Sequence, residues 1–226
     1  MSIDLGQLYA ASRHRITDLV MSSPAHAQDT GCPATPGWSV HDVVAHLRGI
    51  AEDVRTGNLE GVATDPWTAA QVERHRSTAT VDLLAQWADD APLLESILSS
   101  PQGAAVGRAV VDVHAHEGDV RGGLGRPAPL PDEFATWAMP AITEQFFTAI
   151  TAAGLPAVRI VTAEGDHLGQ ESAPISLGVS RVELLRAVLG RRSAAQVMSY
   201  DWGGADASPY LTHFFIFGPR DTDLVE

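Results

Sequence analysis

The segment VDVHAHEGD, residues 111–119, gathers two histidines and three carboxylates within a short stretch. Imidazole nitrogen and carboxylate oxygen are both ligands of divalent metal ions, zinc among them. On a helix each residue turns about 100° from the one before, so Asp112 and His116 lie within about 40° of each other. Asp119 returns to the same face, whereas His114 points away from it. The spacing therefore predicts that Asp112 and His116 share one ion, although a solvated helix face has the same pattern.

A metal site that keeps a position open for chemistry needs a third protein ligand. The best candidate is His46 in VVAHLRG, because it borders an apolar stripe of its own predicted helix and faces inward. His41, about 140° further round that helix, is a weaker candidate. From spacing alone, a hydrogen-bonded core histidine remains the main alternative for His46.

Apolar residues at helical spacing place these candidates on a set of helices. Helices are predicted from Asp4 to Met21, from Ser39 onward, from Thr68 in a short segment, from Thr80 in a longer one, and over residues 108–122. Ser39 with Asp42 forms a capping box, and Thr80 is expected to cap its helix. Four principal antiparallel helices with short links favour an up-and-down bundle, in which facing helices bring inward side chains together.

The pattern changes in the last third of the chain. A helix over 132–153 is followed by two short β-branched runs, AVRIVTAE and APISLGV, separated by GDHLGQ, which has the composition of a turn. A helix opens at Ser180 and ends at Gly190, and the aromatic tail YLTHFFIFGPR is expected to pack. The sequence thus predicts an α+β protein, with a helical bundle at 1–145 and a small α/β domain at 146–226.

Composition narrows the classes of function. The chain has 226 residues and a net charge of −13, which argues against binding to nucleic acid or to an anionic membrane. It has one cysteine, Cys32, so an internal disulfide is excluded, and a lone cysteine is more often structural than catalytic. The first residues lack a basic segment followed by an apolar one, and no run of about 18 apolar residues occurs. We therefore expect a cytoplasmic protein with neither nucleic-acid nor membrane partners.

Four blocks of the sequence, in the same order, resemble the mycothiol-dependent maleylpyruvate isomerase family of the DinB-like bundle superfamily, and its actinobacterial members in particular. The blocks are ATPGWSVHDVVAHLRG, DPWTAAQVERHRSTATVDLLAQW, DVHAHEGDVRGGLGRP, and VELLRAVLGRRSAAQVMSYDW followed by FGPR. The resemblance implies a DinB-like four-helix bundle that binds a divalent metal, typically zinc, and a smaller C-terminal α/β domain.

The resemblance also implies a ligand set and a thiol. The family's ligands fall on His46, Asp112 and His116, the same three residues that spacing suggests. The isomerase for which the family is named has Glu where this chain has Asp112, which is one methylene shorter and leaves isomerase activity open. In the family the metal activates mycothiol, and a metal-bound thiol is deprotonated. We therefore expect a cis–trans isomerase of the maleylpyruvate isomerase type or a thiol S-transferase. The alternative is a DinB-like metal-binding or stress-response protein without turnover.

Further side chains are predicted to assist. Asp119 would orient a ligand histidine or accept a proton, although a surface or capping role fits it as well. Arg191, Arg192 and Arg220 would bind carboxylates of the thiol or the substrate, with Arg220 preferred for the substrate and the other two for the cofactor. An ordinary salt bridge is an equal alternative for each arginine. The expected partners are a small-molecule thiol and an electrophilic substrate, for a monomer or homodimer.

Overall fold

The computed structural model describes residues 3–226, and the chain divides into two compact units. The first holds the described residues up to Ala128 together with Glu226, and the second spans Pro129–Val225. The candidate metal ligands all belong to the first unit.

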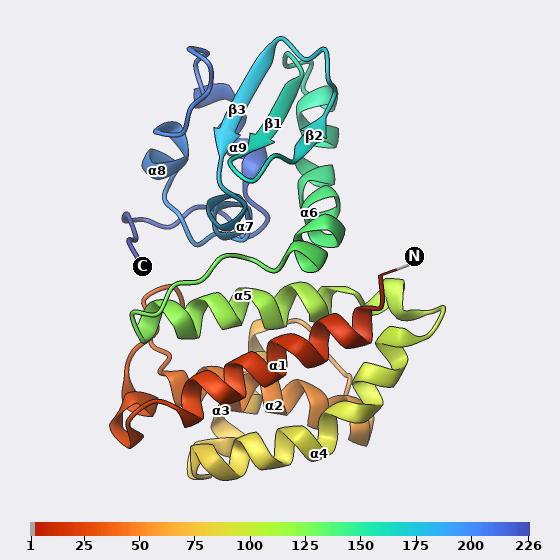
Figure 1. The fold of residues 1–226 in the computed structure, drawn as a ribbon, viewed down its shortest axis with the longest axis vertical. Helices are drawn as coiled ribbons and strands as arrows, with labels where there is room; N and C mark the ends of the chain where they lie inside the picture. The colour runs from red at the N-terminus through yellow and green to blue at the C-terminus, as the bar shows by residue number, and fades with distance from the viewer. Residues whose placement is uncertain (1–2) are drawn as a thin grey trace. The chain divides into compact units, whose positions relative to one another are not determined.

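The first unit is the predicted helical bundle (Figure 1). Its α-helices are α1 (Leu5–Met21), α2 (Val40–Thr56), α3 (Asp65–His75), α4 (Thr80–Ser99) and α5 (Arg108–Gly123), with short 3₁₀ helices η1 (Ala25–Asp29) and η2 (Gly103–Val106). Helices α1 and α2 each pack against both α4 and α5, and α3 packs against α2. The order around the bundle is therefore α1, α4, α2, α5, and the consecutive helices α1 and α2 lie diagonally. This order differs from a simple up-and-down bundle, because the long connection between α1 and α2 lets the chain cross.

Local sequence explains where these helices begin. Asp4 accepts hydrogen bonds from the backbone of Gly6 and Gln7 and caps α1. Ser39 and Asp42 form the predicted capping box at the start of α2. Two predicted starts differ from the structure. Thr80 is the first helical residue of α4 rather than its cap, and α3 begins at Asp65, before Thr68, because Pro66 suits the first turn of a helix.

The core of this unit is apolar and closely packed around one aromatic pair. Trp87 on α4 is fully buried, and its Nε1 donates a hydrogen bond to the hydroxyl of Tyr9 on α1 at 3.1 Å. The two rings meet edge to face with their centroids 6.3 Å apart. This contact joins α1 to α4, the helix that in turn packs against α2 and its candidate ligand His46.

The second unit is a small mixed sheet with helices (Figure 1). Its elements are α6 (Asp132–Ala152), β1 (Val158–Thr162), β2 (His167–Gly169), β3 (Ile175–Val179), α7 (Arg181–Val188), α8 (Ala194–Met198), the 3₁₀ helix η3 (Ser208–Tyr210) and α9 (Leu211–Phe214). The strand order is β2-β1-β3. Ile160 on β1 pairs with Leu168 of the antiparallel β2 and with Leu177 of the parallel β3. The α+β class predicted from the sequence is confirmed.

The structure differs from the sequence-based expectations for this part of the chain in three details. Position 145, the predicted domain boundary, lies inside the continuous helix α6, and the compact units part after Ala128. The reason is that α6 packs against α7, α9 and β2 of the second unit. The GDHLGQ segment is not only a turn, since His167–Gly169 forms β2. The tail packs in part: Tyr210 and Phe214 are buried beside Phe146, whereas Phe217 is exposed.

Within residues 3–226, none of the helices combines the length and the apolar character needed to cross a lipid bilayer.

Candidate metal centre

The structure brings His46, Asp112 and His116 together, with one nitrogen or oxygen from each within 4.8 Å of the others. The Nε2 of His46 lies 3.5 Å from Oδ2 of Asp112, and the Nε2 of His116 lies 3.6 Å from Oδ1 of the same carboxylate. Ligand atoms bound at 2.0–2.1 Å to a tetrahedral ion lie roughly 3.3 Å apart. The spacing of the three donors therefore fits a single divalent ion.

The helices position these three side chains without strain. Asp112 and His116 are one helical turn apart on α5, and α5 packs directly against α2, which carries His46. Both histidines are buried, whereas the side chain of Asp112 is 37% exposed. The Oδ2 atom that faces His46 is itself buried, so the exposed part of Asp112 lies elsewhere on its side chain.

The second nitrogen of each histidine faces an oxygen acceptor. His46 Nδ1 lies 2.8 Å from Oε1 of Gln71, and His116 Nδ1 lies 2.9 Å from Oδ2 of Asp119. For His46 the hydrogen-bond contact is at Nδ1, which favours the hydrogen there and would leave Nε2, 3.5 Å from Asp112, for a metal ion. For His116 the contact with Asp119 is a close ion-pair distance that would act in the same sense. Metal-binding histidines are held in this way, so the contacts support the fit to a metal. Asp119 is fully buried, which excludes the surface alternative for that residue.

Trp38 forms a wall of the site that the sequence reasoning missed. Its ring centroid lies 5.3 Å from that of His46 and 5.9 Å from that of His116, and it is stacked on the latter. The residue sits just before α2, where its backbone N–H donates to the carbonyl of Thr35 and its carbonyl accepts from Cys32. In the sequence Trp38 stands out only as the end of a PGW turn immediately before the capping box. A turn composition does not reveal what a side chain contacts.

The other ionisable side chains of the segment have structural partners. His114 is buried on another face of α5, with Nδ1 donating to the carbonyl of Val110, and burial lowers its pKa to about 4. Burial would raise the pKa of Glu117, but hydrogen bonds from Arg15 and Ser12 outweigh it and keep the pKa below its usual value. Neither residue belongs to the three-donor cluster, as the helical spacing indicates.

Cys32 and His41 do not join the site. Burial raises the pKa of the Cys32 thiol to about 12, which keeps it protonated and unreactive near neutral pH. His41 lies on α2, but its Nδ1 is 2.9 Å from the hydroxyl of Thr80 on α4. Among residues 3–226 the cluster of candidate metal ligands therefore consists of the two histidines and one aspartate named above.

The three arginines singled out in the sequence belong to the second unit. The guanidinium of Arg192 is paired with the carboxylate of Glu183, and Arg191 donates to the carbonyl of Leu189. The backbone N–H of Arg220 donates to the carbonyl of Arg192, so these residues are neighbours. Their roles toward thiol or substrate stay predictions.

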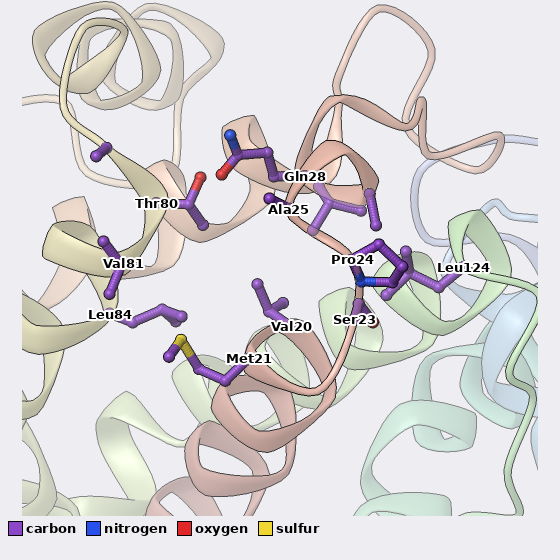
Figure 2. A pocket seen from close by; sticks show the side chains of 13 residues that line it. Val20, Met21, Ser23, Pro24, Ala25, Gln28, Thr80, Val81, Leu84 and Leu124 are labelled. Carbon is purple, nitrogen blue, oxygen red and sulfur yellow. The ribbon is translucent and has the colours of Figure 1, made fainter.

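A separate pocket of about 350 Å³ opens in the first unit (Figure 2). It is lined by Val20, Met21, Ser23, Pro24, Ala25, Ala27, Gln28, Val40, Ala79, Thr80, Val81, Leu84 and Leu124. The lining is mostly apolar, and Gln28 and Thr80 supply polar groups on one side of it (Figure 2). None of the three candidate ligands lines this pocket, so it is distinct from the metal centre.

The helical unit matches a known domain family. Residues 9–119 match the model of the mycothiol maleylpyruvate isomerase N-terminal domain, a stretch that contains His46, Asp112, His116 and Asp119. No curated protein matches the chain in sequence.

Two solved structures share the fold. The crystal structure of the mycothiol-dependent maleylpyruvate isomerase aligns with a TM-score of 0.53 and 14% identity, over 84% of this chain and 90% of that one. A histidine-to-alanine mutant of that isomerase aligns with the same TM-score and coverage at 13% identity. At these identities the likeness concerns the fold alone. Residues 9–119 thus form a mycothiol maleylpyruvate isomerase N-terminal domain, and 84% of the chain shares the fold of that isomerase.

Proposed function

We propose that this chain is an enzyme that holds a divalent metal ion, zinc in the first instance, and uses mycothiol as a cosubstrate. The observation that carries the proposal is the cluster of His46, Asp112 and His116, which offers one donor atom from each residue, all within 4.8 Å of one another and thus close enough to converge on one ion. Two nitrogens and one oxygen are a zinc ligand set that leaves at least one position open. The names of the structural relatives support the choice of thiol.

The proposed reaction needs a reactive thiol sulfur that the chain itself does not supply. A divalent ion in this cluster would supply a Lewis acid that lowers the pKa of a coordinating thiol. The protein's own residues set the conditions for this: the histidines keep Nε2 directed at the site, and Trp38 covers both rings. Cys32, the one cysteine of the chain, lies outside the three-donor cluster, and burial raises the pKa of its thiol, so the proposal takes the sulfur from a bound small molecule.

Two reactions share this activated thiol. In the isomerase reaction the sulfur adds to a conjugated cis double bond, the resulting carbon–carbon single bond rotates, and elimination breaks the carbon–sulfur bond to give the trans product. In the transferase reaction the sulfur displaces a leaving group or opens an epoxide, and the carbon–sulfur bond persists. The relatives' names favour the isomerase. The resemblance implies a Glu in the isomerase at the position of Asp112, and this shorter carboxylate is the reason to test the transferase as well.

Other predicted roles become part of the proposal. Asp119 lies buried 2.9 Å from Nδ1 of His116, where it would orient that ring or serve as a proton acceptor. Arg220 would bind a substrate carboxylate, and Arg191 and Arg192 would bind the thiol, because a guanidinium pairs well with planar anions. We propose that the protein works in the cytoplasm as a monomer or homodimer.

Thermal unfolding of the zinc-loaded protein tests the proposal for the thiol. Mycothiol should raise the unfolding temperature by several degrees at saturating concentration, because a ligand that binds only the folded state stabilises it. Glutathione serves as the comparison thiol, and zinc-free protein as the control that should show no shift. If no thiol shifts the zinc-loaded protein, the chain is a metal-binding protein without thiol chemistry.

Thiol consumption then separates the two reactions. An isomerase regenerates mycothiol in each turnover, so maleylpyruvate should isomerise with no loss of free thiol. A transferase consumes one thiol for each product molecule, measured with an epoxide or an alkyl halide. Absence of both reactions with a bound thiol would contradict the proposed enzyme.

A further inference from the structure

On the side of its ring away from Asp112, His46 contacts Gln71, a residue of helix α3. Gln71 lies 2.8 Å from His46 Nδ1 through its Oε1, and both side chains are buried. An amide can present either its oxygen or its NH₂ group to a neighbour, and the two choices favour opposite histidine tautomers. What fixes the orientation of Gln71 therefore also fixes which nitrogen of His46 is available to a metal.

Asp53 fixes that orientation. The Nε2 of Gln71 donates to Oδ2 of Asp53 at 2.8 Å, and an ionised carboxylate only accepts hydrogen bonds. The other oxygen, Oδ1, accepts from Arg74 at 2.8 Å and from Asn58 at 2.9 Å. Because the carboxylate of Asp53 can only accept, the NH₂ group of Gln71 faces Asp53, and the amide oxygen is then the atom that faces His46.

The backbone is shaped to allow this contact. A Cβ atom at Gly49, three residues after His46 on α2, would lie 2.6 Å from Cβ and 2.8 Å from Cγ of Gln71. Such distances are far below van der Waals contact. Only glycine at this position lets α3 approach closely enough for Gln71 to reach the histidine. The arrangement is thus built into the packing of α2 against α3.

We propose that Asp53 and Gln71 are positioning residues that hold His46 in the Nδ1–H tautomer, with the Nε2 lone pair directed into the metal centre. The inference deepens the proposed function and rests on the proposed metal site, but the tautomer itself is measurable without metal. The competing account is that the network only stabilises the packing of α3 on α2.

The substitution Asp53→Asn discriminates between these accounts. Arg74 and Asn58 still require an acceptor at the Oδ1 position, so the new amide must turn its NH₂ group toward Gln71. Two donors then face each other, and Gln71 must flip and present its own NH₂ group to His46. The expected result is a shift of His46 toward the Nε2–H tautomer. Gln71→Leu removes the acceptor altogether and should release the preference for Nδ1–H.

The experiment is nitrogen-15 NMR of the histidine rings in the metal-free protein, together with zinc affinity from chelator competition. Wild-type His46 should appear as the Nδ1–H tautomer. Both variants should lose that preference and bind zinc roughly 10- to 100-fold more weakly, the usual cost of removing an outer-shell partner. The matched control is Asp90→Asn, another buried carboxylate, which pairs with Arg48 and Arg55 and bonds to neither His46 nor Gln71.

The outcomes are separable. A folded Asp53→Asn protein that keeps the Nδ1–H tautomer overturns the proposal, as does an equal affinity loss in Asp90→Asn. If Gln71→Leu does not fold, Asp53→Asn, which preserves size and shape, decides alone. If the wild-type protein binds no zinc, the proposed function fails, but the tautomer measurement still decides the role of Asp53 and Gln71.

Discussion

Replacing His116 by Ala is expected to abolish stoichiometric metal binding. The substitution removes one of three donors and leaves His46 and Asp112, which cannot form the three-ligand set of an open zinc site. The loss of affinity should exceed the roughly 10- to 100-fold that an outer-shell change costs. Chelator competition measures it, and quenching of the Trp38 emission by bound Co²⁺ offers an independent readout because that ring stacks on His116.

A matched control accompanies this variant. His14→Ala removes an exposed histidine on α1 and should leave zinc affinity within about twofold of wild type, because surface changes away from a site have small effects. A His116→Ala protein that keeps one zinc ion at wild-type affinity would show that the cluster is not the metal site.

Replacing Trp87 by Ala is expected to lower the free energy of unfolding by about 3–5 kcal/mol. The indole is fully buried between α4 and its neighbours, and its removal leaves a cavity that closely packed helices fill only in part. Tyr9 also loses the donor to its hydroxyl and its edge-to-face partner. Urea unfolding followed by circular dichroism measures the change.

The control for this prediction is Trp67→Ala on α3. That ring is only half-buried, with Nε1 donating to the carbonyl of Asn58, so its removal should cost about 1 kcal/mol. Since the chain has two compact units, the transition is fitted for the helical unit alone. Equal losses in the two variants would contradict the assignment of Trp87 as the centre of the core.

The closeness of the three candidate ligands can be predicted from the sequence because its signal is local. Asp112 and His116 are one turn apart, and helical geometry alone places them on one face. The inward orientation of His46 follows from its place beside an apolar stripe. The capping box at Ser39 is equally local and is confirmed.

What the sequence does not predict depends on contacts between elements. Gln71 and Asp53 carry no pattern that distinguishes them from solvated polar residues, yet both are almost completely buried behind His46. Trp38 lies in a turn, and its contact with two histidines arises only when α2 and α5 pack. The diagonal order of the helices and the place of α6 in the second unit are likewise decided by packing rather than by periodicity.

X-ray absorption at the zinc edge, on protein loaded with one equivalent of zinc and kept free of added thiol, reads out the ligands of the bound ion. A site built from two histidines and one aspartate should give nitrogen and oxygen neighbours at about 2.0–2.2 Å, with the outer-shell scattering of two imidazole rings and no sulfur. A spectrum with no imidazole contribution, or with a sulfur neighbour near 2.3 Å, would contradict a site built from His46, Asp112 and His116.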